Sequence, residues 1–161
     1  YKDLYLGGAV YPGGTAAANL LDDYEEGTWT PGAADANTGG NTAAGYSQQY
    51  GWYVKIGNRV FVTWRLEGID TTGMTAGNAL YIRGLPETIA NPSPSGQVFS
   101  GAAGTGNVVI DNGVSAFINA NSVPTGFRLS TSTGAGVGRN IIVSNLTSGT
   151  ANIFGQFFYF V

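Results

Sequence analysis

The sequence contains neither cysteine nor histidine, and only 11% of its 161 residues are charged. Without cysteine there are no disulfides and no thiolate ligands for zinc. Without histidine the chain lacks the commonest general base, the commonest metal ligand and the usual catalytic triad. These absences argue against the common forms of metal-dependent and hydrolytic catalysis.

Basic residues and long apolar runs are also scarce. Seven Lys and Arg stand against ten Asp and Glu, which gives a net charge of −3, and the basic residues are scattered along the chain. A nucleic-acid surface needs a basic patch, and a membrane-spanning helix needs about 18 or more consecutive apolar residues. We therefore expect neither a nucleic-acid partner nor membrane insertion.

Glycine and aromatic residues, by contrast, are plentiful. The chain has 26 glycines, 43% of its residues are hydrophobic and 12% are aromatic. Disordered chains lack such hydrophobic and aromatic content. The composition therefore favours a folded β protein whose strands are separated by glycine-containing turns.

Strand-like segments recur at intervals of about 8–12 residues, which is typical of a β-sandwich. The clearest pair, 50–56 and 59–67, is rich in aromatic and β-branched residues and flanks Gly57-Asn58, a hairpin signal. Further candidates are 78–85, 96–102, 107–120, 126–132, 140–147 and 150–160. We expect an antiparallel β-sandwich of jelly-roll type.

The N-terminal region predicts one short helix near residues 20–26. Asn19 can cap it, Asp22 follows three residues later, and Gly27 can end it. Before it, residues 1–14 look like the end of a preceding shaft or repeat, and we expect residues 15–161 to form one β-sandwich domain.

Acidic residues suggest a metal or catalytic site only weakly. A calcium site or a pair of glycosidase carboxylates could use the cluster of Asp22, Asp23, Glu25 and Glu26, but its spacing does not match an EF-hand. Helix capping and contacts to neighbouring groups explain this cluster better. Turn formation likewise explains Asp35, Asp70 and Asp111. We expect no metal, no cofactor and no catalytic residue.

Both faces of the predicted hairpin carry large apolar groups, so one face can pack in the core while the other meets a subunit or a ligand. Flat aromatic rings also serve sugar binding. We select Trp52 and Tyr50, with Tyr46 nearby, as a stacking platform. The alternative for Trp52 is a place in a subunit interface.

The chain ends in the strongly apolar segment QFFYFV. An exposed strand of this kind would promote aggregation. We therefore assign Phe157, Phe158 and Phe160 to the core or to a subunit interface, and we expect copies of the chain to associate.

Four segments carry a resemblance to a known family: LYLGG at 4–8, LDDYEEGTWTP at 21–31, Y-x-KIGN-x-V-x-V at 53–62 and GLP at 84–86. Their order and spacing resemble those of C-terminal domains of tailed-bacteriophage tail fibres, tailspikes and prophage tail proteins. The resemblance covers residues 4–86, whereas the remainder agrees only in composition.

The resemblance implies a distal, homotrimeric domain at the tip of the fibre or tailspike in the virion. Such domains bind a host cell-surface polysaccharide or protein, trimerise the shaft, or do both. Where the full protein is a depolymerase, catalysis usually lies in a preceding β-helix. Receptor binding is our first expectation, a purely structural cap the second and glycan hydrolysis the third. The low charge favours an uncharged glycan as ligand.

Overall fold

The computed structural model describes residues 10–11, 23–90, 98–109, 116–119, 125–133 and 137–161. Within these ranges ten strands form a single sheet in which every strand pairing is antiparallel, and the only helical element is a 3-10 turn, Val143–Asn145. The expected all-β, antiparallel class is confirmed. No helix in the described ranges has the length and apolar character needed to cross a membrane. The strands are β1 (Tyr24–Trp29), β2 (Gly32–Ala34), β3 (Gln48–Ile56), β4 (Arg59–Ile69), β5 (Tyr81–Arg83), β6 (Val98–Gly106), β7 (Ala116–Asn119), β8 (Gly126–Thr133), β9 (Val137–Asn140) and β10 (Ala151–Phe160).

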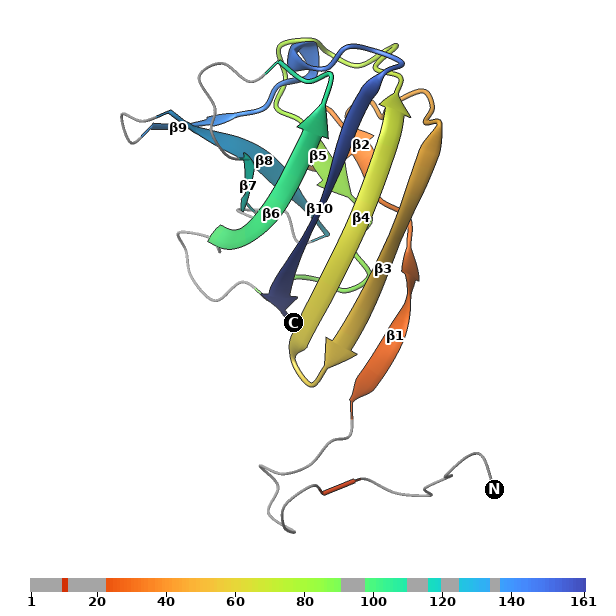
Figure 1. Ribbon diagram of the computed structural model, residues 1–161, viewed down its shortest axis with the longest axis vertical. Coiled ribbons are helices and arrows are strands. Elements are labelled where there is room, and N and C mark those ends of the chain that lie inside the picture. The colour runs from red at the N-terminus through yellow and green to blue at the C-terminus, as the bar shows by residue number, and fades with distance from the viewer. Residues whose placement is uncertain (1–9, 12–22, 91–97, 110–115, 120–124, 134–136) are drawn as a thin grey trace.

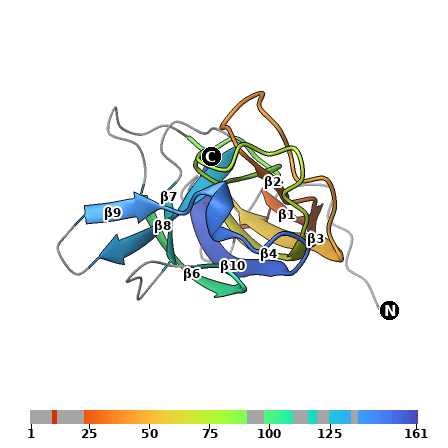
Figure 2. The same cartoon turned by 90° about the horizontal axis from the view of Figure 1, so that it is seen from above.

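The sheet rolls around its own core. The strand order is β1-β3-β4-β10-β6-β7-β8-β5-β2, with β9 paired to β8. Strands β1 and β2 stand at opposite ends of this order, yet only Thr30 and Pro31 separate them in the chain. The two ends of the sheet must therefore come together at this short connection. Figures 1 and 2 show β3, β4 and β10 in one wall, with β2, β5 and β8 behind them.

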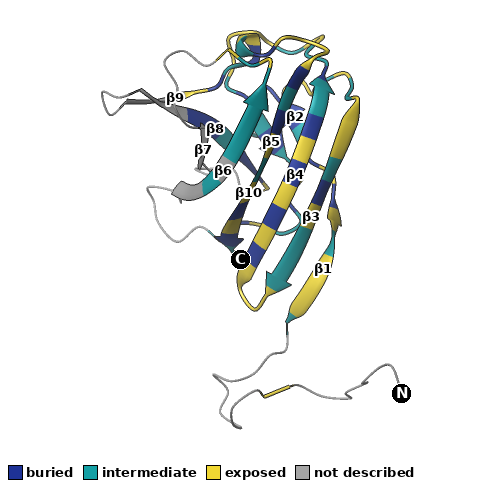
Figure 3. Ribbon diagram, viewed as in Figure 1, coloured by how far each residue is buried: buried dark blue, intermediate teal, exposed yellow. Residues whose placement is uncertain are grey.

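The core lies between these walls. Along β4, Val60, Val62, Trp64 and Leu66 are buried, and the residues between them are exposed (Figure 3). This alternation is the period of two that a half-buried strand requires. From the opposite wall, Phe127 of β8 places its ring 4.8 Å from that of Trp64. Edge-to-face packing of this kind adds about 0.5–1.5 kcal/mol to the stabilisation from burial alone.

The hairpin predicted from the sequence is confirmed. Ile56 of β3 pairs with Arg59 of β4, and Gly57 and Asn58 form the turn between them. Gly57 has φ 57°, a left-handed conformation that suits glycine at a tight hairpin turn. The same register turns Trp52 away from the core and Trp64 into it.

The described part of residues 20–26 does not form the expected helix. Residues 24–26 begin strand β1, whose six residues all pair with β3. The ring of Tyr53 lies against Gly27, and the ring of Trp29 lies against Gly51. These cross-strand contacts need an extended chain, so tertiary packing overrides a weak local helix signal. The capping residues Asn19 and Asp22 lie outside the described residues.

The expected shaft segment, residues 1–14, also falls almost entirely outside the described part. Only Val10 and Tyr11 of this segment are described, and both side chains are exposed. The boundary at residue 14 therefore stays a prediction.

Candidate functional site

The outer face of the sheet concentrates exposed apolar groups. We define the outer face as the surface of β1, β3, β4 and β10 that points away from the core. A monomeric protein rarely exposes a large contiguous apolar patch without a functional reason. Six of the nine large hydrophobic residues exposed in the described part lie on this face: Tyr24, Trp52, Ile56, Phe61, Phe154 and Phe158.

A hollow of about 440 Å³ opens in the middle of the outer face, and we call it the Trp52 hollow. Residues from β3, β4, β10 and β6 line it, two glycines among them. Its lining consists of Tyr50, Trp52, Thr63, Trp64, Arg65, Ala103, Gly104, Phe154, Gly155 and Gln156.

Strand register explains how these residues meet. Tyr50 pairs with Arg65, which pairs on its other side with Phe154, so their side chains form one row across the sheet. In the next row, Trp52 and Gln156 flank Thr63. Directly paired residues on one face stand about 4.5–5.5 Å apart. Because Thr63 is smaller than Trp52 and Gln156 on either side of it, a depression remains above Thr63.

The aromatic walls of the hollow are held by their neighbours. The rings of Tyr50 and Trp52 contact edge to face, with centroids 4.8 Å apart, and Trp52 remains 52% exposed. On the opposite side the ring of Phe154 lies over Gly104, where an added Cβ would come within 2.4 Å of it. An aromatic ring placed over a paired glycine covers backbone that no side chain protects.

The charge inside the hollow is balanced. Arg65 forms an ion pair with Glu67, and the hydrogen bond to that carboxylate raises the pKa of Arg65 above its ordinary value. The guanidinium also lies 5.9 Å from the ring centre of Phe154. Arg65, Thr63 and Gln156 thus offer hydrogen-bonding groups without a net charge in the hollow.

The structure brings two of the three proposed stacking residues together. Trp52 and Tyr50 line the hollow, whereas Tyr46 lies elsewhere, packed against the core. The hydroxyl of Tyr46 accepts a hydrogen bond of 2.8 Å from the backbone N–H of Ala33, and burial raises its pKa. Tyr46 therefore does not line the hollow with Trp52 and Tyr50.

The three phenylalanines of the terminal strand occupy different environments. Phe157 is buried and only 5% exposed, and its ring contacts Phe127 with centroids 4.9 Å apart. Phe158 points to the outer face and is 38% exposed. Phe160 is half-buried and packs against the edge of the core.

The described acidic residues of the N-terminal cluster are engaged in local contacts. Asp23 forms an ion pair of 2.9 Å with Lys55, which raises the pKa of that lysine. Glu25 accepts a hydrogen bond from the hydroxyl of Tyr53, whose pKa is raised by this bond. No group of three or more potential metal-ligating residues occurs in the described ranges.

Sequence reasoning missed Phe154, Arg65 and Gln156. Their alternation along the strands is visible in the sequence, but it does not reveal that β10 pairs with β4. Only that pairing places Phe154 opposite Tyr50 across Arg65.

Aromatic faces beside an amide, a hydroxyl and a guanidinium can stack on a flat apolar surface and hydrogen-bond at its edges. Nothing in the hollow resembles a paired acid and base. The family comparisons add no assignment, because no protein-family model matches the chain and no curated protein matches it.

Proposed function

We propose that this chain is the distal receptor-binding and trimerising head of a bacteriophage tail fibre or tailspike, at its tip in the virion. Its role is attachment to a host cell-surface glycan or protein and not catalysis. The observation that carries this proposal is the Trp52 hollow, an aromatic-walled depression with hydrogen-bonding groups on an exposed sheet face. The four sequence segments that resemble phage fibre domains supply the biological setting.

The proposed architecture is a jelly-roll-like sandwich assembled as a homotrimer. The contact between Trp64 and Phe127 across the core supports two facing walls. Exposed apolar groups such as Ile56 and Phe61 support contact between subunits. Fibres are built on threefold axes, and a closed cyclic trimer satisfies that symmetry.

Binding at one site is weak in this proposal. Each hydrogen bond to a sugar hydroxyl contributes about 0.5–1.5 kcal/mol net. Stacking on Trp52 adds the burial of its exposed face. Three sites on one trimer raise the avidity by a factor of about 10²–10⁴ when the cell surface presents repeated ligands.

The alternative is a purely structural cap that trimerises the fibre while another region binds the host. The exposed apolar residues of the outer face favour this reading, because a partner subunit could cover them. Substitution of Trp52 separates the two functions, since the residue is exposed and its loss leaves the core intact.

The experiment compares Trp52→Ala with Tyr24→Ala, which removes a similarly exposed aromatic side chain on the same face but outside the hollow. Light scattering measures assembly, and a glycan array together with attachment to host cells measures binding. We expect Trp52→Ala to remain trimeric and lose binding, while Tyr24→Ala keeps both. Loss of the trimer in Trp52→Ala, or unchanged binding, would overturn the receptor-binding role of the hollow.

A further inference from the structure

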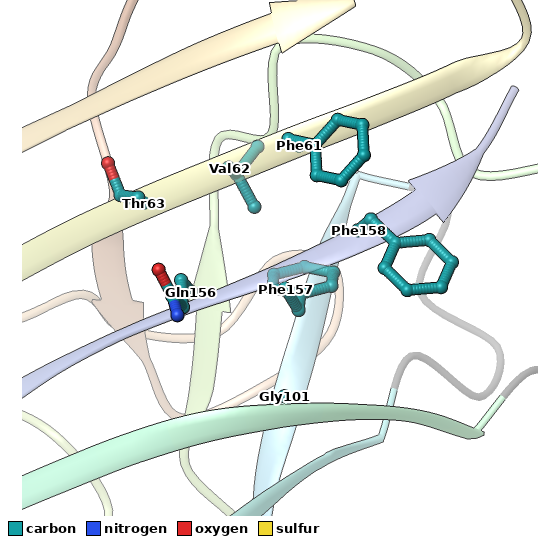
Figure 4. A pocket seen from close by; sticks show the side chains of 7 residues that line it. All are labelled: Phe61, Val62, Thr63, Gly101, Gln156, Phe157 and Phe158. Carbon is teal, nitrogen blue, oxygen red and sulfur yellow. The ribbon is translucent and has the colours of Figure 1, made fainter.

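The Trp52 hollow is one half of a longer groove. A second hollow of about 550 Å³ lies beside it, lined by Phe61, Val62, Thr63, Gly101, Gln156, Phe157 and Phe158 (Figure 4). We call it the Phe158 hollow. Both hollows include Thr63 and Gln156, so they adjoin along β4 and β10. The two together form one groove that runs parallel to these strands.

The groove has an aromatic group at each end. Phe154 borders the first hollow and Phe158 the second, and both project from the outer face of β10. They are four positions apart along the strand, which corresponds to about 13 Å at 3.3–3.4 Å per residue. A single monosaccharide ring is smaller than this separation. A ligand that contacts both ends must therefore contain several linked sugar units.

The two ends differ in charge. Arg65 in the Trp52 hollow has Glu67 as its ion-pair partner. At the other end the guanidinium of Arg59 lies over three rings, 5.0 Å from the centre of Phe158, 5.3 Å from Phe160 and 6.0 Å from Phe61.

No acidic residue in the described ranges forms an ion pair with Arg59. On the same face, Glu26 stands two strands away and level with Phe61, roughly 12 Å from Arg59 at the usual strand spacing and rise per residue. Its carboxylate accepts a 2.7 Å hydrogen bond from the hydroxyl of Tyr24. Arg59 is thus an exposed cation that contacts aromatic rings and has no ion-pair partner among the described residues.

We propose that this groove binds an acidic oligosaccharide of several units, with a carboxylate-bearing sugar at Arg59 and uncharged units over Trp52. The planar guanidinium matches a carboxylate in a two-bond geometry, and its contacts with three rings hold it at this end of the groove. This inference rests on the proposed receptor-binding function and specifies its ligand. It also replaces the expectation of an uncharged glycan, which relied on the low overall charge.

The test uses a glycan array that presents uronate-containing oligosaccharides of one to eight units beside their carboxyl-reduced counterparts, which are the same chains without charge. We expect wild-type protein to prefer the longer, unreduced chains. Arg59→Gln should weaken this binding about tenfold or more, the size of a lost hydrogen bond to a charged group. Arg59→Lys should retain part of it, because the charge remains. Binding should also weaken as salt concentration rises.

The outcomes separate this inference from the proposed function. Binding to carboxyl-reduced chains with equal affinity, or an Arg59→Gln protein that binds as wild type does, overturns the acidic site and leaves the receptor-binding role intact. Equal binding of single sugars and long chains overturns the extended groove. Absence of any glycan binding by the wild-type protein overturns this inference, and absence of attachment to host cells as well removes the proposed function too. Loss of the trimer in Arg59→Gln, measured by light scattering, would assign this end of the groove to a second copy of the chain.

Discussion

The indole ring of Trp29 lies directly over Gly51, its partner across strands β1 and β3, and its Nε1–H donates a 3.1 Å hydrogen bond to the backbone carbonyl of Thr63. The same pairing of an aromatic ring with a directly opposed glycine occurs at Tyr53 with Gly27. These contacts hold the edge strand β1 onto the sheet. They also bring the β1–β2 connection to the place where the rolled sheet meets itself.

Gly51→Ala is expected to destabilise the protein. An added Cβ would stand 2.4 Å from Nε1 of Trp29, so the buried indole must move and its hydrogen bond weakens. Overpacking of this kind costs about 1–3 kcal/mol, measurable as a lower midpoint of urea unfolding. Gly77→Ala is the matched control, because nothing lies within 4 Å of its added Cβ. Equal midpoints for the two variants would show that the Trp29–Gly51 contact is not tight.

Two neighbouring phenylalanines should respond differently to truncation. Phe157 is buried between Trp64 and Phe127, and Phe157→Ala is expected to cost about 3–5 kcal/mol. Phe158 is on the outer face, and Phe158→Ala should cost no more than about 1 kcal/mol. Chemical denaturation of both variants measures the difference. A large cost for Phe158→Ala would mean that a partner subunit buries this ring in solution.

A comparison of two buried tryptophans can measure the contribution of one hydrogen bond to the unfolding free energy. Trp29→Phe and Trp64→Phe remove the same volume, but only Trp29 has a hydrogen-bond acceptor for its Nε1–H among the described residues. We expect Trp29→Phe to lose about 1 kcal/mol more stability than Trp64→Phe. The difference in unfolding free energy between the two variants measures this term. A larger loss for Trp64→Phe would indicate that its N–H is bonded in solution.

We expect titration of Asp35 to make the protein less stable in acid. Hydrogen bonds from the backbone N–H groups of Thr75 and Asn41, and from the Asn41 side chain, lower the pKa of this buried carboxyl to about 2 from an ordinary value of 3.8. A lowered folded-state pKa means that the stabilisation is full above the ordinary value and is lost as pH falls from about 4 towards 2.

Urea unfolding at pH 6 and pH 3 tests this prediction. Asp35→Asn should be less stable than wild type at pH 6 and should lose less on acidification, because the titrating group is gone. Parallel losses for both proteins would place the acid sensitivity at other carboxyls.

Sequence patterns alone determined several features of this protein. Alternation along 59–67 placed Val60, Val62 and Trp64 on one face and Phe61 on the other, and Gly57-Asn58 located the hairpin turn. These features are local, because side-chain period and turn conformation depend on neighbouring residues. Which of the two faces is buried came from the structure.

Other features depended on contacts between distant residues, and only the tertiary structure decided them. The segment at residues 24–26 became a strand because rings and glycines pack across β1 and β3, whereas its local residues had suggested a helix. Tyr46 lies outside the Trp52 hollow, because its ring packs against the core and its hydroxyl is bonded to the backbone of Ala33. Phe154 lies in the same hollow as Tyr50 and Trp52 because β10 pairs with β4. These two strands are about a hundred residues apart in the sequence, so no local pattern encodes their register.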